Sequence, residues 1–114
     1  MDKKINDEQL VTIAMQMILH AGNARNYVDE AFNCVKKFKN KEAQNKLKEA
    51  HEEIKLAHQA QTDVIQQEAS GIQYAYSPLF THAQDTLMTI TSEINVTEKL
   101  ISTINLLRIG ESDE

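Results

Sequence analysis

The histidine at position 82 is the side chain in this sequence whose type and position best suit chemistry. The 114 residues contain four histidines, and His82 follows five positions after Ser77, close to a predicted helix start. An uncharged imidazole is a competent nucleophile near pH 7. The positive end of a helix dipole also stabilises an added phosphate, although this effect fades within about one turn. His82 is therefore a candidate phosphate acceptor.

Asp85 is a titratable residue that a helix would place close to His82. It follows three positions later, which is about 60° further around a helix, so the two side chains occupy adjacent faces. A histidine and a carboxylate at this spacing also occur on ordinary solvated helices. The residues alone leave two interpretations open: a reactive pair, or an exposed histidine beside a surface aspartate.

Three helical segments must position these side chains. Apolar or small residues recur in alternating steps of four and three, which predicts helices over residues 7–38, 41–69 and 77–109. Short connections make neighbouring helices antiparallel, so the fold class is all-α, an antiparallel three-helix bundle in a single domain. The residues predicted to be buried are Leu10, Ala14, Met17, Ala21, Ala24, Val28, Ala31 and Val35, then Ala43, Leu47, Ala50, Ile54, Ala57 and Val64, then Ala83, Leu87, Ile90, Ile94, Thr97, Ile101 and Ile104.

Local capping signals mark the helix ends. Asn6 and Gln9 have the spacing of a capping box. Gly71 supplies a C-terminal cap for the second helix, and Ser77 followed by Pro78 is a strong start signal for the third. Gly110 is expected to end the third helix. Gln61 stands at a seam position of the second helix where an apolar residue is expected.

The third helix carries a second stripe opposite its seam, and the stripe is small and half-polar. Such a surface suits close approach by another helix, so we expect self-association along it. The alternative is an ordinary solvated face, because Ser and Asn are equally at home in water. The stripe consists of Asp85, Met88, Ser92, Asn95, Ser102 and Leu106.

Composition excludes several classes of protein. Cys34 is the single cysteine and cannot form an internal disulfide, and no leader or long apolar run is present, so we expect a cytoplasmic protein. The net charge of −5 disfavours nucleic acid as a partner. The densest basic run, residues 36–41, is interpreted as a solvated turn, with a docking patch as the alternative.

The run from His82 to Met88 closely resembles the His-x-Gln-Asp-His-Leu-Met motif of the enzyme IIA subunits of the lactose/cellobiose-type sugar phosphotransferase system. The stretches Ala21–Arg25, Ala57–Thr62 and Glu68–Gly71 are also similar to that family, so the resemblance covers almost the whole chain. The family usually has a second histidine where this chain has Thr86, which leaves the effect of that difference open.

The resemblance implies a phosphocarrier that forms a homotrimer of nine helices. In such a protein His82 accepts a phosphoryl group from the carrier HPr and passes it to a cysteine of the cognate IIB protein or domain. The membrane IIC permease then imports a β-linked disaccharide of the cellobiose, chitobiose or lactose class. Asp85 and its two symmetry copies would share one Mg²⁺ ion that holds the trimer together.

Three further residues lie within or beside the similar stretches. Arg25 and His58 could supply donors to the phosphoryl oxygens, with surface pairing and a seam-edge imidazole as the alternatives. Gln84 lies roughly 200° around the helix from His82, so an interface hydrogen bond is favoured over direct contact. From other classes of function, a non-catalytic helical scaffold for protein partners and a metal-binding bundle stay as alternatives.

Overall fold

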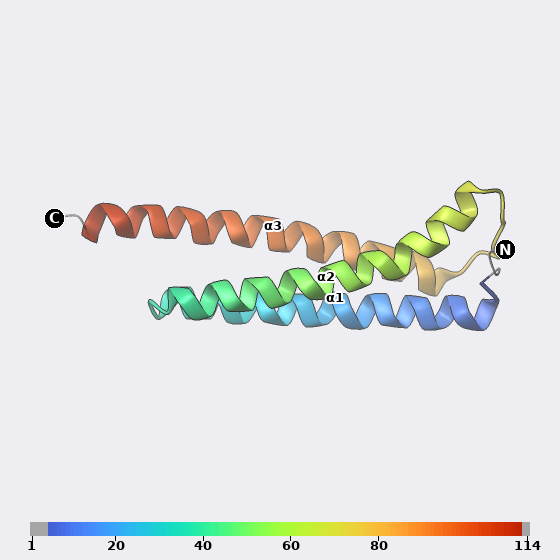
Figure 1. Cartoon of the computed structure of the whole chain (residues 1–114), viewed down its shortest axis with the longest axis horizontal. Coiled ribbons are helices and arrows are strands. Elements are labelled where there is room, and N and C mark those ends of the chain that lie inside the picture. The colour runs from blue at the N-terminus through green and yellow to red at the C-terminus, as the bar shows by residue number, and fades with distance from the viewer. Residues whose placement is uncertain (1–4, 113–114) are drawn as a thin grey trace.

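The computed structural model describes residues 5–112 and consists of three long helices, α1 (Asp7–Lys36), α2 (Asn40–Ala69) and α3 (Pro78–Ser112). They form a rod of 63 × 24 × 20 Å (Figure 1). α2 runs antiparallel to α1, and α3 returns parallel to α1. α1 packs against both other helices, whereas α2 and α3 meet much less extensively. The predicted all-helical bundle is confirmed for the single chain.

The core is built from the predicted seams. Every predicted position in α1 and α2 is buried, and in α3 the predicted Thr97 and Ile104 are partly buried while the rest are fully buried. Many seam residues are alanines, so the backbones approach closely and larger side chains fill the spaces between turns. Gln61 is half-buried, and its Oε1 has no hydrogen-bond partner among residues 5–112. The largest fully buried side chains are Met17, Val35, Val64, Leu87 and Ile90.

α1 begins as its sequence predicts but ends earlier. Asn6 Oδ1 accepts from the Gln9 amide at 2.8 Å, and Gln9 Oε1 accepts from the Asn6 amide at 2.9 Å, so the capping box is confirmed. The helix stops at Lys36 and not at the expected Phe38, because Phe38 adopts φ +65°. The Lys39 amide then donates to the Cys34 carbonyl at 2.8 Å. This hydrogen-bond pattern is the Schellman cap that glycine usually makes.

The other helix ends follow their capping signals, with one exception. Gly71 has φ +103°, and the Ile72 amide donates to the Gln67 carbonyl at 3.0 Å, which completes a second Schellman cap. Ser77 Oγ accepts from the Phe80 amide at 3.1 Å and so caps α3. The expectation that Gly110 ends α3 is wrong, because the helix continues to Ser112. A helical glycine costs only about 1 kcal/mol relative to alanine, which a long helix tolerates. No helix among the described residues is long and apolar enough to cross a membrane.

Candidate functional site

His82 lies in the second turn of α3 and its side chain is exposed. The Ser77 cap and Pro78 set the start of α3, and the buried Ala83 and Leu87 fix which side of the helix faces the core. His82 is thereby directed away from the bundle. Among residues 5–112 no side chain hydrogen-bonds to its imidazole, so both ring nitrogens are open to a partner.

The other histidines have different surroundings. His20 Nδ1 lies 3.0 Å from Glu53 Oε2, and His51 Nε2 lies 3.0 Å from Glu98 Oε2. Those two imidazoles join α1 to α2 and α2 to α3. His58 is exposed, and its backbone carbonyl accepts a hydrogen bond from Thr62 Oγ1 at 2.7 Å. His82 therefore differs from His20 and His51 in having no carboxylate partner among residues 5–112, and from His58 in lying near the start of a helix.

Asp85 is exposed on α3 one turn beyond His82. Within residues 5–112, no group of three or more His, Cys, Asp or Glu side chains could hold a metal ion. One chain brings one carboxylate to this position. The predicted Mg²⁺ site requires carboxylates from three chains, so it stays a prediction.

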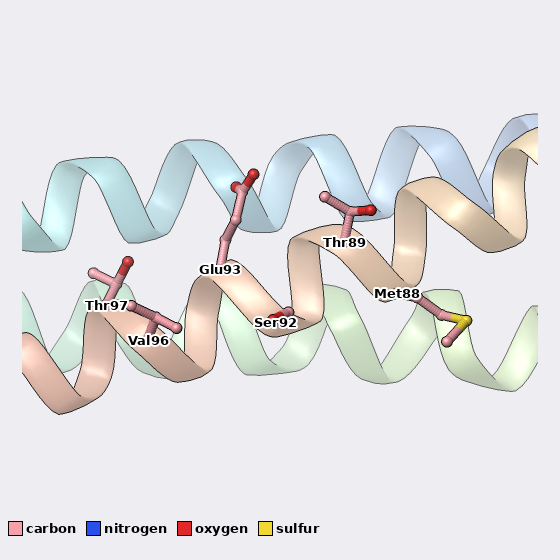
Figure 2. A pocket seen from close by; sticks show the side chains of 6 residues that line it. All are labelled: Met88, Thr89, Ser92, Glu93, Val96 and Thr97. Carbon is pink, nitrogen blue, oxygen red and sulfur yellow. The ribbon is translucent and has the colours of Figure 1, made fainter.

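The outward face of α3 is exposed along its whole predicted stripe, from Asp85 to Leu106. A shallow hollow lies on this helix beyond His82, and all of its lining residues come from α3 (Figure 2). Glu93 and Thr89 point toward α1 there, whereas Met88 lies on the other side of α3 and is exposed. Neither His82 nor Asp85 lines the hollow, so it is not the candidate reaction site. Its lining residues are Met88, Thr89, Ser92, Glu93, Val96 and Thr97.

Arg25 is paired with a carboxylate that sequence reasoning did not identify. Its Nε donates to Glu93 Oε2 at 2.9 Å and its Nη2 to Glu93 Oε1 at 2.7 Å. The hydrogen bonds to Glu93 raise the pKa of Arg25 above its usual value. Glu93 lies eleven residues beyond His82, or about 16 Å along α3 at 1.5 Å per residue. Within one chain, therefore, Arg25 joins α1 to α3 and does not line a pocket around His82.

Among residues 5–112 no hydrogen bond joins His58 or Gln84 to His82. His58 is exposed on α2, seven residues beyond His51. Gln84 is half-buried on the side of α3 that faces away from His82. The phosphoryl contact considered for His58 and the interface hydrogen bond expected for Gln84 both stay predictions.

Comparison with known proteins covers most of the chain. Residues 12–105 match the family described as "PTS system, Lactose/Cellobiose specific IIA subunit". The lichenan-specific phosphotransferase enzyme IIA component of Bacillus subtilis (strain 168) is 38% identical over 82 residues, covering 72% of this chain and 74% of that protein. The lactose-specific EIIA component of Staphylococcus epidermidis is 38% identical over 85 residues, covering 75% and 82%. The crystal structure of the cellobiose-specific enzyme IIA from Bacillus anthracis superposes with a TM-score of 0.82 and 34% identity, covering 93% of this chain and 95% of that one.

Proposed function

Since the chain belongs to the lactose/cellobiose-specific IIA subunits of the sugar phosphotransferase system, we propose that His82 is its phosphoryl acceptor. The proposed donor is the phosphohistidine of HPr, and the proposed acceptor is a cysteine of the cognate IIB protein or domain. The protein would act in the cytoplasm and serve the IIC permease indirectly. The single observation that carries the assignment is the exposed, unpaired imidazole of His82 near the start of α3, inside the region that matches the family.

The proposed chemistry consists of two in-line displacements. In the first, the lone pair of His82 Nε2 attacks the phosphorus, a new N–P bond forms, and the N–P bond to the HPr imidazole breaks. In the second, a IIB thiolate attacks the same phosphorus, an S–P bond forms and His82 leaves as the neutral imidazole. The protein has little covalent work to do beyond positioning, because the transferred charge is carried by the phosphoryl oxygens. An exposed imidazole on a rigid helix meets both requirements, access and fixed direction.

We further propose that three chains assemble through the outward face of α3. Met88 and Leu106 are each 67% exposed there, which is unusual for a face that stays in water. Three copies of Asp85 brought together on this face would repel one another. A shared divalent cation relieves that repulsion, and carboxylate oxygens are the ligands that Mg²⁺ prefers. The chemistry of the site therefore fits a structural Mg²⁺ ion held by Asp85.

The transported sugar is proposed only as a class. The relatives are named for lichenan and lactose, and the similar crystal structure for cellobiose. All three names refer to β-linked saccharides, so we propose a β-linked disaccharide of the cellobiose, chitobiose or lactose class for this system. The proposal concerns the system as a whole, because sugar selection belongs to the membrane component.

Phosphorylation tests the acceptor directly. Incubation of the intact protein with phosphoenolpyruvate, enzyme I and HPr should add one acid-labile phosphoryl group, measured by mass spectrometry. His82→Ala should abolish the gain while circular dichroism stays helical. His58→Ala is the matched control, because it removes the other free imidazole, and it should still be labelled. Label on another side chain would contradict the proposal, and no label on the wild-type chain would favour a scaffold that only binds partners.

The proposed metal site at Asp85 has its own test. Asp85→Leu should remove the bound divalent metal measured by elemental analysis of the purified protein. The same variant reports on the metal without involving His82, whose phosphorylation is measured separately. Unchanged metal content and unchanged oligomeric state would show that Asp85 does not hold a shared ion.

A further inference from the structure

The turn between α1 and α2 carries a concentrated positive charge on a protein that is negative overall. Residues 36–41 contain four lysines and no acidic residue, whereas the whole chain has a net charge of −5. All four lysine side chains are exposed. The charge therefore lies near one end of the rod, where the chain reverses between the two helices, and the end of α3 extends past this turn (Figure 1).

An aromatic residue, Phe38, lies between these lysines in the sequence. Phe38 is 73% exposed and occupies the positive-φ position of the helix cap, where glycine is the usual residue. A bulky residue in this conformation is an outlier that costs free energy. The folded structure thus exposes an apolar side chain to water at this turn, at a position where glycine would make the protein more stable.

Arg108 fixes this arrangement from α3. Its Nη1 donates to the Val35 carbonyl at 2.6 Å, and its guanidinium lies 3.9 Å from the centre of the Phe38 ring. The contact places a cation from α3 against the ring. One face of the ring is covered by Arg108, and the large remaining exposure leaves the rest of the ring free to enter an apolar phase.

We propose that this basic tip, defined as Lys36, Lys37, Phe38, Lys39, Lys41 and Arg108, binds the surface of an anionic lipid bilayer. Lysines near such a surface are attracted by its negative potential, and an aromatic residue between them enters the headgroup region. A stable protein interface buries about 1,200 Å² or more of surface in total. A bilayer requires only the inserted ring and the flanking charges, so the observations favour lipid over an acidic protein.

The proposed orientation is compatible with an open His82. Arg108 follows His82 by 26 residues in α3, which separates the tip from the histidine by about 39 Å. Binding of lipid at this end of the rod therefore keeps the imidazole away from the bilayer. If the chain is the trimer proposed above, parallel α3 helices place three tips at one end, and their binding is multivalent. The lipid proposal goes beyond the proposed phosphotransfer and does not depend on it.

Vesicle flotation of the full-length protein tests the charges. We expect binding to vesicles of phosphatidylcholine with phosphatidylglycerol, little binding to phosphatidylcholine alone, and release in 0.5 M NaCl. One lysine at the surface contributes about fivefold to partitioning, so Lys37→Gln with Lys39→Gln should weaken binding by roughly 25-fold. Lys48→Gln with Lys55→Gln, on the shaft of α2, makes the same change in net charge and should have little effect. Equal losses in the two double variants would overturn the proposal.

Phe38 provides a second, independent measurement. The chain contains no tryptophan, so Phe38→Trp introduces a single fluorescent reporter at the tip. Its emission should shift to the blue on anionic vesicles and be quenched by brominated lipid. Phe38→Gly suits the positive φ, so this variant should stay folded while partitioning falls by about tenfold. An unchanged emission spectrum would overturn insertion, and tip-dependent binding to polyglutamate without binding to vesicles would assign the tip to an acidic protein instead.

Discussion

The outward faces of α2 and α3 differ although both helices lie on the same central helix. Exposed positions of α2 are largely charged or amide side chains, such as Lys48, Glu49, Glu52 and Lys55. Exposed positions of α3 include Met88, Val96, Leu100, Leu106 and Leu107, each at least half exposed. A helix that is apolar on more than one side is usually buried on more than one side. The comparison supports the proposal that α3, rather than α2, faces a partner chain.

The inward faces of the two helices, by contrast, are alike. Leu87 of α3 is 0% exposed and Leu47 of α2 is 6% exposed. Leu87→Ala and Leu47→Ala should each lower the free energy of unfolding by about 2–5 kcal/mol, because both leave a cavity in the core. Urea denaturation at one protein concentration measures the loss. A cost below about 1 kcal/mol for Leu87→Ala alone would mean that α3 is not held by this core.

A negative charge introduced on the outward face of α3 should change the oligomeric state, whereas the same charge on the outward face of α2 should not. Met88→Glu places a carboxylate on the face of α3 that we propose is buried in the trimer, so light scattering should show a lower mass with helicity retained. Gln59→Glu makes the same change of charge on the exposed face of α2, and the mass should not change. Dissociation by both variants, or by neither, would remove the distinction between the two faces.

The smallest effect is expected at the ion pair between α1 and α3. The side chains of Arg25 and Glu93 are 45% and 46% exposed, so solvent screens their attraction. Arg25→Gln should therefore cost no more than about 1 kcal/mol in chemical denaturation, and less at high salt. Phosphoryl uptake should persist, since Arg25 lies far along the rod from His82. Loss of uptake with stability intact would restore Arg25 as a contact of the phosphoryl group, contributed across a subunit interface.

The sequence was sufficient for features that depend on neighbours along the chain. The seam positions, the Asn6 capping box and the Ser77 cap all rest on spacings of three or four residues, and a helix converts such spacings into faces and caps by its geometry alone. The exposure of His82 follows from the same rule, because the buried Ala83 and Leu87 determine which way it points. Its resemblance to a known motif then added a chemical role that no spacing could supply.

Other features could not be predicted from the sequence because they join residues far apart in the chain. Arg25 meets Glu93 across 68 positions and Arg108 meets Val35 across 73, and both pairings depend on how far each helix slides along its neighbour. Periodicity determines the face of a helix but not this offset. Phe38 is a related case. Its positive φ belongs to a helix cap in which glycine is the expected residue, and only the folded bundle brings Arg108 beside its ring. The local sequence thus determined three helices and an outward histidine, and the tertiary packing decided which charges meet and what the tip of the rod presents.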